Sequence, residues 1–289
     1  MAKSDKMHDV AACMSAHLAK VKRVPFWGKD GRICLDYKLL AEALKVPIQS
    51  GEDVRTGRFA GAIDLWIAQE FGRAGFEGLW PRLEEPRALD PELLRATSQL
   101  PRRDARVGSR LMKEAGSSNA NVLGSVYVKQ VDVGLSSWLS GPELLISTKT
   151  MGGSFGKNLP NRFEEAYGDA KNLRARYPLA AHGFFFLVKS TILDERSAFE
   201  KAVHMLHQLA LSQDVYDATC LLLVDWDEGS DVISVPSDKQ ALVSADLRAE
   251  AFFETLIEIM LREAPIDWHK KARSLRSLSQ QGLGGAIVI

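Results

Sequence analysis

The chain has 289 residues, of which 46% are hydrophobic and 26% charged, values that are ordinary for a globular protein. No run approaches the ~18 consecutive apolar residues of a membrane-spanning helix, and the first residues lack the pattern of a signal peptide. Lysine plus arginine and aspartate plus glutamate both total 37, so any surface for an anionic partner must be sought in local clusters.

The N-terminal part of the chain is expected to be mostly helical. Apolar residues recur with helical spacing from Tyr37 to Leu44 and, more strongly, from Phe59 to Phe71. Several prolines then interrupt the chain before a further predicted helix, Asp104 to Ala115, which ends in a Gly-Ser-Ser-Asn loop. We therefore separate a helical N-terminal region, residues 1–115, from a second region, residues 116–289.

The second region begins with two predicted strands and a helix. Residues from Val122 to Val133 alternate between apolar and polar side chains, and Glu143 to Lys149 forms the next strand after a short turn. In the helix that follows, Asn158 is the expected cap and Pro160 falls in the first turn, where proline is tolerated. Its apolar stripe consists of Leu159, Phe163, Ala166, Ala170 and Leu173.

Two further strands alternate with helices in the rest of the chain. The apolar run from His182 to Val188 predicts a strand buried on both faces, and a similar run covers Cys220 to Val224. Asp194 is expected to cap the amphipathic helix between them. A hairpin-like stretch, Asp231 to Val235, precedes a long helix from Ala245 to Arg262. This order predicts an α/β fold whose mixed sheet has antiparallel strands first and helical crossovers later.

The cysteines offer neither a disulfide framework nor a zinc site. The three of them, Cys13, Cys34 and Cys220, lie far apart without a paired spacing. Cys220 falls within an apolar strand and is predicted to be a buried thiol. Together with the absence of a membrane-spanning run, this pattern predicts a cytoplasmic protein that does not contact a membrane.

Charged side chains fall at neighbouring ends of the first two predicted strands. Strand alternation places Ser147 and Lys149 on one face, and Asp132 lies near the end of the preceding strand. Because adjacent strands lie ~4.8 Å apart, such an aspartate and lysine can meet around one cation or one phosphate. Glu164 and Glu165 follow on the next helix.

Three short segments resemble, in chain order, the signature of the PD-(D/E)XK nucleases: Val131-Asp132-Val133, Ile146-Ser147-Thr148-Lys149 and Phe163-Glu164-Glu165. The order of predicted elements is also similar to the αβββαβ core of that family, over roughly residues 95–225. Ser147 stands at the position that is usually acidic. Some restriction endonucleases for CCGG-like sites have this S-x-K form, with a helix-borne glutamate about a dozen residues later. Here the glutamates lie slightly further on, and Asp132 lacks the preceding proline of the motif name.

The resemblance implies a restriction-endonuclease-like fold, with a mixed β-sheet flanked by helices, and magnesium-dependent phosphodiester hydrolysis. Asp132 and Glu164 would hold Mg²⁺, because this ion prefers oxygen ligands. Glu164 is preferred over Glu165 because it borders the apolar stripe of its helix, but Glu165 and Glu143 stay open as the second ligand. Lys149 would neutralise charge on the scissile phosphate, and Ser147 would orient a water molecule.

Basic residues around the predicted core are candidates for contacts with DNA phosphates. The first set of candidates consists of Arg102, Arg103, Arg106, Lys157 and Arg162. A second basic cluster, from His269 to Arg276, follows the last long helix. Either set can equally be a solvated helix face, and the loop 152–158 either follows the DNA backbone or is simply a long turn.

The function implied by the resemblance is that of a type II restriction enzyme from a bacterial restriction–modification system. It would cut double-stranded DNA as a homodimer, because two-fold partners can cut both strands of a palindromic site. The region 1–115 would serve DNA recognition or dimerisation. The main alternative, motivated by Ser147, is a nuclease-like scaffold without catalysis that binds nucleic acid or protein. A third is an unrelated α/β enzyme in which Lys149 only forms a salt bridge.

Overall fold

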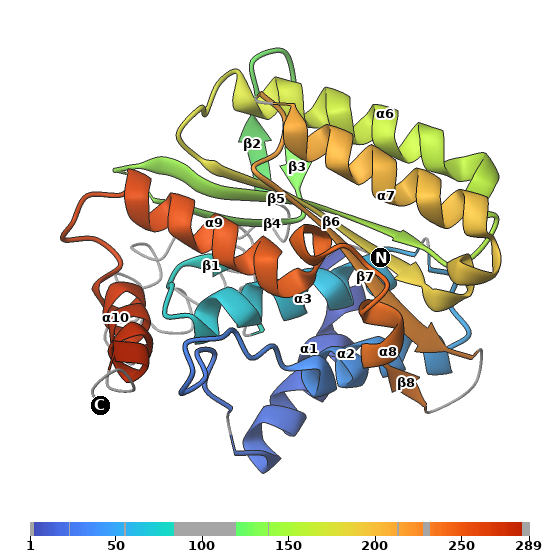
Figure 1. Cartoon of the computed structure of the whole chain (residues 1–289), viewed down its shortest axis with the longest axis horizontal. Helices are drawn as coiled ribbons and strands as arrows, with labels where there is room; N and C mark the ends of the chain where they lie inside the picture. Colours follow the sequence, from blue (N-terminus) through green and yellow to red (C-terminus); the bar gives the residue numbers. More distant parts are fainter. Residues whose placement is uncertain are drawn as a thin grey trace, which may run out of the picture.

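The computed structural model describes residues 3–22, 24–54, 56–83, 120–137, 139–212, 214–227 and 232–284. In this part of the chain a mixed β-sheet lies between two layers of helices (Figure 1). None of the helices described is long and apolar enough to cross a membrane. The helix predicted from Asp104 to Ala115 and the boundary at residue 115 lie outside the described residues.

The main sheet has the strand order β1-β4-β5-β6-β7-β8. β4 pairs antiparallel with both β1 and β5, whereas β5, β6 and β7 run parallel and β8 is antiparallel to β7. The predicted mixed sheet is thereby confirmed. The strands are β1 (Leu79–Trp80), β4 (Val133–Ser137), β5 (Gly141–Met151), β6 (Ala181–Lys189), β7 (Ala218–Trp226) and β8 (Ile233–Ser234).

Helices cover both faces of this sheet. On one face α6 (Phe155–Arg174) and α7 (Arg196–Leu211) lie side by side, each forming a crossover between parallel strands (Figure 1). On the other face lie α3 (Gly57–Arg73) and α9 (Ala249–Glu263). The remaining elements are α1 (Lys3–Lys20), α2 (Tyr37–Gln49), η1 (Ser190–Asp194), α8 (Ser237–Gln240), η2 (Ala245–Leu247) and α10 (Lys270–Gly284).

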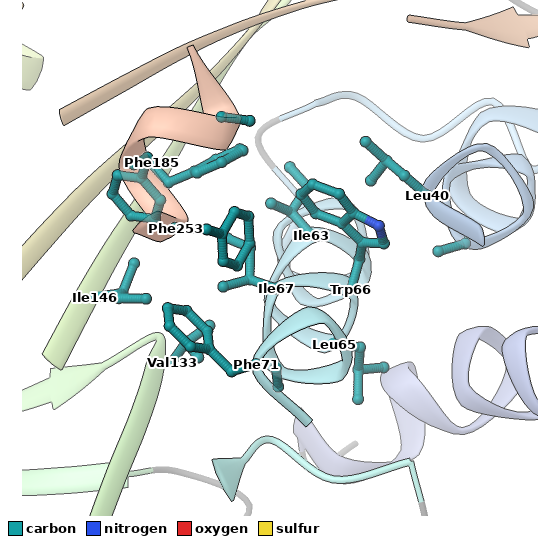
Figure 2. Packing of buried hydrophobic residues seen from close by; sticks show 14 of the residues in the cluster. Leu40, Ile63, Leu65, Trp66, Ile67, Phe71, Val133, Ile146, Phe185 and Phe253 are labelled. Atoms are coloured by element: carbon teal, nitrogen blue, oxygen red, sulfur yellow. The ribbon is translucent and has the colours of Figure 1, made fainter. Parts of the chain in front are cut away.

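The core on the α3 side joins the N-terminal helices to the sheet in one continuous cluster. Trp66 of α3 packs against Phe185 of β6 and Phe253 of α9, with ring centroids 6.0 and 5.9 Å apart. The ring centroids of Phe71 and Phe253 lie 4.9 Å apart, and Ile146 of β5 lies in the same cluster (Figure 2). Each large apolar side chain buried in this way contributes ~1.5–3 kcal/mol. The helices and the sheet therefore share the same apolar interior.

Several predicted elements are confirmed. The periodic segments at Tyr37 and Phe59 are α2 and α3, and the segment ending at Lys149 is β5. The two apolar runs are β6 and β7, and β6 is buried along its length except at its last residue. Cys220 is fully buried, and that burial raises the pKa of its thiol well above the ordinary value.

The single strand predicted from Val122 to Val133 is wrong. The chain turns back after four residues, so that β2 (Ala120–Leu123) and β3 (Val128–Val131) form a separate antiparallel hairpin. The turn is held by Asn172 of α6, whose Oδ1 accepts the backbone N–H of Val126 at 2.8 Å. A Cβ on Gly124 would overlap the Asn172 amide, so the glycine is required for this contact.

Two predicted helix starts are also wrong. α6 begins at Phe155 rather than after Asn158, because burial of Phe155 with the apolar stripe extends the helix backwards by a turn. Asn158 lies inside the helix and donates to the carbonyl oxygen of Ser154 at 3.3 Å. Asp194 ends the short helix η1, and Glu195 precedes α7 in its place.

The last long helix also begins later than predicted. Residues Ala245–Leu247 form the separate turn η2, and α9 starts at Ala249. Burial of Leu247 in the cluster on the α7 side and of Phe252 in the cluster on the α3 side sends the two segments to opposite faces of the sheet. A continuous helix would not reach both.

Candidate functional site

The candidate site lies where β4 and β5 separate. The register pairs Val133 with Ile146, and the backbone N–H of Asp132 donates to the Ile146 carbonyl at 3.3 Å. Beyond this point the chain leaves β5, and the Asp132 carboxylate accepts the backbone N–H of Thr148 at 2.9 Å. Asp132 therefore lies beside the segment of β5 that carries Ser147 and Lys149, as the strand pattern predicted.

A second aspartate reaches the same part of β5 from the α3 face of the sheet. The Thr148 hydroxyl donates to the Asp64 carboxylate at 2.6 Å, and Asp64, on α3, is only 9% exposed. Asp64 and Asp132 both line a small cavity of about 60 Å³, together with Trp80 and Gln130. The sequence signal for Asp64, which sequence reasoning missed, is an acid within the otherwise apolar stretch from Phe59 to Ala68.

On the α6 face of β5, Lys149 forms an ion pair with Glu165. The Lys149 ammonium lies 3.1 Å from Glu165 Oε1, and Arg162 lies 3.5 Å from the other oxygen. Partial burial raises the pKa of Glu165, but the positive charges of Lys149, Arg162 and Lys129 outweigh it and hold the pKa below its usual range. Glu165 is therefore anionic at neutral pH and neutralises Lys149.

The other two glutamates considered as metal ligands lie away from Lys149. Glu164 is exposed, and the side chain on α6 that reaches the sheet is Glu165. The preference for Glu164 placed the ligand at the border of the apolar stripe of α6, whereas the glutamate that pairs with Lys149 is Glu165. Glu143 lies near the other end of β5, ~20 Å along the strand, and its carboxylate contacts His269 at 2.6 Å.

Ser147 is buried against a tyrosine that sequence reasoning missed. The fully buried Tyr216 hydroxyl hydrogen-bonds with Ser147 and donates to the carbonyl oxygen of Ala166 at 3.0 Å. Burial raises the pKa of Tyr216 far above its usual range, more than the Ser147 contact lowers it. Three nearby carboxylates add to the rise: Asp169, Asp132 and Glu165. Tyr216 is therefore a neutral donor within electrostatic reach of the acidic groups from both β4 and α6.

A further acid on α6 is neutralised from the hairpin. Asp169 is 6% exposed, forms an ion pair with Lys129 of β3 and accepts the Tyr127 hydroxyl at 3.0 Å. These contacts fasten the hairpin to the helix that carries Glu165. Asp169 is thereby committed to holding these elements together.

The acidic side chains fit a magnesium site of the simplest kind. Among the described residues no three His, Cys, Asp or Glu side chains are grouped to hold a metal ion. Magnesium, however, commonly takes one or two protein carboxylates and fills its remaining positions with water and substrate oxygens. Asp64 and Asp132 supply two carboxylates that meet at Thr148, which satisfies this requirement.

The candidate DNA contacts have different environments. Arg102, Arg103 and Arg106 lie outside the described residues. Lys157 is exposed on the first turns of α6, and Arg162, half-buried one turn later, contacts Glu165.

The second basic cluster attaches α10 to its neighbours. Arg273 donates to the Leu261 carbonyl at 2.6 Å, and Arg276 pairs with Glu258 of α9. His269 contacts Glu143 of β5. Most of this cluster therefore holds the fold together.

Comparisons with protein-family models, with curated proteins and with solved structures gave no match for the chain. Overall similarity therefore assigns it to no family. The likeness to the PD-(D/E)XK nucleases depends on the few residues described above and on the order of the elements that carry them.

Proposed function

We propose that this chain is a magnesium-dependent endonuclease that hydrolyses phosphodiester bonds of double-stranded DNA. The observation that carries the proposal is the hydrogen bond from the Thr148 backbone to Asp132, one residue before Lys149, whose ammonium forms an ion pair with Glu165. When the separate β2–β3 hairpin is set aside, the order α3-β1-β4-β5-α6-β6 is similar to the αβββαβ order of the PD-(D/E)XK nucleases. This agreement supports a restriction-endonuclease-like fold as part of the same proposal.

Each polar residue has a defined task in this proposal. Asp132 and Asp64 would hold the magnesium ion, which supplies Lewis acidity and lowers the pKa of nearby water. Lys149 would stabilise negative charge that develops on the phosphate, because its side chain is only 17% exposed and its charge is weakly screened. Glu165 positions Lys149 until the phosphate competes for the ammonium. Tyr216 fixes Ser147 beneath the site.

Plasmid cleavage tests the proposal directly. Purified wild type should convert supercoiled DNA to cut products with magnesium and not with a chelator. Lys149→Ala and Asp132→Asn should lose that activity. Lys201→Ala, which removes an exposed lysine of α7, is the matched control and should cleave like wild type. Full magnesium-dependent cleavage by Lys149→Ala would refute the assignment.

We further propose the role of a type II restriction enzyme in the bacterial cytoplasm, acting as a homodimer. A two-fold dimer presents one site to each strand of a palindromic sequence. Sequencing the ends of cleaved DNA would reveal a recurring sequence if the enzyme is site-specific. Light scattering on the free protein and its DNA complex would measure whether two copies assemble.

One pair of observations favours the alternative of a binding module without catalysis. Glu165 already neutralises Lys149, and Ser147 is 5% exposed at the position that is usually acidic. Calorimetric titration of magnesium into wild type and Asp132→Ala separates the two functions. A nuclease should show a magnesium site that requires Asp132, whereas a binding module should show none.

A further inference from the structure

A cavity of about 450 Å³ opens beyond the carboxyl ends of the three parallel strands. The last residues of β5, β6 and β7 all line it: Met151, Lys189 and Trp226. Crevices at the carboxyl ends of parallel strands are the usual ligand positions of open α/β sheets. The volume also lies within the ~300–1,000 Å³ of small-ligand sites. Position and size together mark this cavity as a binding site.

One side of the cavity is basic. Lys189 is half-buried, and its ammonium lies 5.4 Å from the centre of the Trp226 ring. Arg162 and the amide of Asn158 line the same side from α6. The aromatic ring and partial burial keep the lysine charge poorly hydrated, so an anion gains more from it than from an exposed lysine.

The start of α6 adds backbone donors to this side. The helix has 20 residues, and Ser154 precedes it without a side-chain capping hydrogen bond. Uncapped N–H groups at the start of a long helix carry a partial positive charge that favours anions. Ser154 also has φ of 52°, a left-handed conformation that costs a non-glycine residue about 1–2 kcal/mol. Strained residues of this kind gather at binding sites.

The opposite side of the cavity contains acids. Glu52 and Asp53 line it from the segment between α2 and α3. Arg58 lies 2.7 Å from Glu52 and neutralises its charge. The basic side chains of the lining therefore belong to β6 and α6, whereas its acids belong to the segment between α2 and α3.

We propose that this cavity is a subsite for a DNA phosphate group, namely the one that neighbours the scissile phosphate on the same strand. The inference rests on the proposed nuclease function and deepens it. Arg162 connects the two places, because it lines the cavity and also contacts Glu165, the partner of Lys149. Thr150, which follows Lys149 on β5, lines the cavity as well. In this arrangement the scissile phosphate would lie at Lys149 and a neighbouring phosphate of the same strand would lie against Lys189.

The salt dependence of DNA binding tests the subsite. Affinity for a labelled duplex is measured without cleavage, in calcium, across a series of salt concentrations for wild type, Lys189→Gln, Lys189→Arg and Lys201→Gln. The logarithm of the affinity falls linearly with the logarithm of the salt concentration, and each lost phosphate contact makes this slope shallower by about one unit. Lys189→Gln should show that loss and bind several DNA sequences uniformly more weakly. Lys189→Arg keeps the charge and should retain the wild-type slope, as should the control Lys201→Gln.

The outcomes separate this inference from the proposed function. A Lys189→Gln slope equal to that of wild type, with a native circular dichroism spectrum, would overturn the subsite and leave the nuclease proposal standing. If wild type binds no DNA, titration with inorganic phosphate tests whether the cavity binds anions at all. Phosphate binding that requires Lys189 would support an anion site while refuting the nuclease, and its absence would refute both.

Discussion

Two of the carboxylate–cation pairs in the described part of the chain, Glu70–Arg73 and Glu165–Lys149, lie in contrasting environments. Glu70 and Arg73 pair on α3, where the Glu70 side chain is completely buried and that of Arg73 is 12% exposed. Arg73 also donates to the carbonyls of Val24 and Cys34 at 2.8 and 2.9 Å. Glu165 pairs with Lys149 at the candidate site, with a side chain that is 44% exposed.

The pKa values of the two acids shift in opposite directions. Burial raises the pKa of Glu70 to about 7, and the charge of Arg73 offsets only part of that rise. At Glu165 the burial effect is smaller than the combined effect of its cationic neighbours, and the pKa falls below its ordinary value. Burial therefore outweighs the neighbouring cation at the buried Glu70, whereas the neighbouring cations outweigh burial at the more exposed Glu165.

The largest expected effect is on stability, from Arg73→Ala. It leaves Glu70 buried without its cation and removes two hydrogen bonds that hold the N-terminal segment. Breaking a buried pair costs about 3–5 kcal/mol. Urea unfolding measures the change, and Arg196→Ala, which breaks an exposed pair on α7, is the control. If the two variants were equally stable, Glu70–Arg73 would not be a clamp.

Lys149→Ala should affect activity and not stability. Loss of one charge-stabilising group at a reaction centre typically lowers the rate by about 10²–10³-fold. The lysine pairs with a half-exposed acid, so the unfolding midpoint should remain near that of wild type. Cleavage rates and urea unfolding of the same preparation provide both readouts. A large loss of stability would place Lys149 in the same class as Arg73.

The pH dependence of the free energy of unfolding should reveal the raised pKa of Glu70. Because its folded pKa is raised from 4.5 to about 7, the folded state holds the proton more tightly than the unfolded state. Its contribution is complete below pH ~4.5 and is lost as the pH rises through ~7, by at most about 3 kcal/mol. Glu70→Gln should flatten the stability curve between these limits. An unchanged slope in that variant would contradict the raised pKa.

The smallest effect is expected from Glu165→Gln. An ion pair with this exposure contributes ~0–1 kcal/mol and is screened by salt. Because the folded pKa of Glu165 is lowered, the contribution is present above the ordinary glutamate pKa and is lost as the pH falls through the folded value. The difference in stability between wild type and Glu165→Gln should therefore disappear in acid. A difference that persists there would show that the pair is not its source.

The sequence allowed prediction of the elements that repeat a simple pattern. The apolar runs of β6 and β7 were sufficient to place these two strands, and the strand predicted from Glu143 to Lys149 placed Asp132 beside the segment that bears Lys149. These features depend on neighbours along the chain or on adjacent strands.

The rest depends on contacts between distant segments. Asp64 contacts Thr148, 84 residues later in the chain, and Tyr216 contacts Ala166, 50 residues earlier. No local sequence pattern therefore predicts either hydrogen bond. The β2–β3 hairpin likewise depends on Asn172, 46 residues after Val126. Glu165 could not be chosen over Glu164 without the angle at which β5 passes α6. The side chains that complete the site are therefore fixed by tertiary packing.

The continuous apolar interior between α3 and the sheet limits how the chain can be shortened. Removing residues 1–115 would remove Trp66 and Phe71, which pack against Phe253, and would expose Ile146 and Phe185 to water. Exposed patches of this kind promote aggregation. The remaining fragment would also lack Asp64, one of the two acids that meet at Thr148. The fragment from residue 116 onwards would thus expose part of its apolar core and lose one acid of this pair in a single truncation.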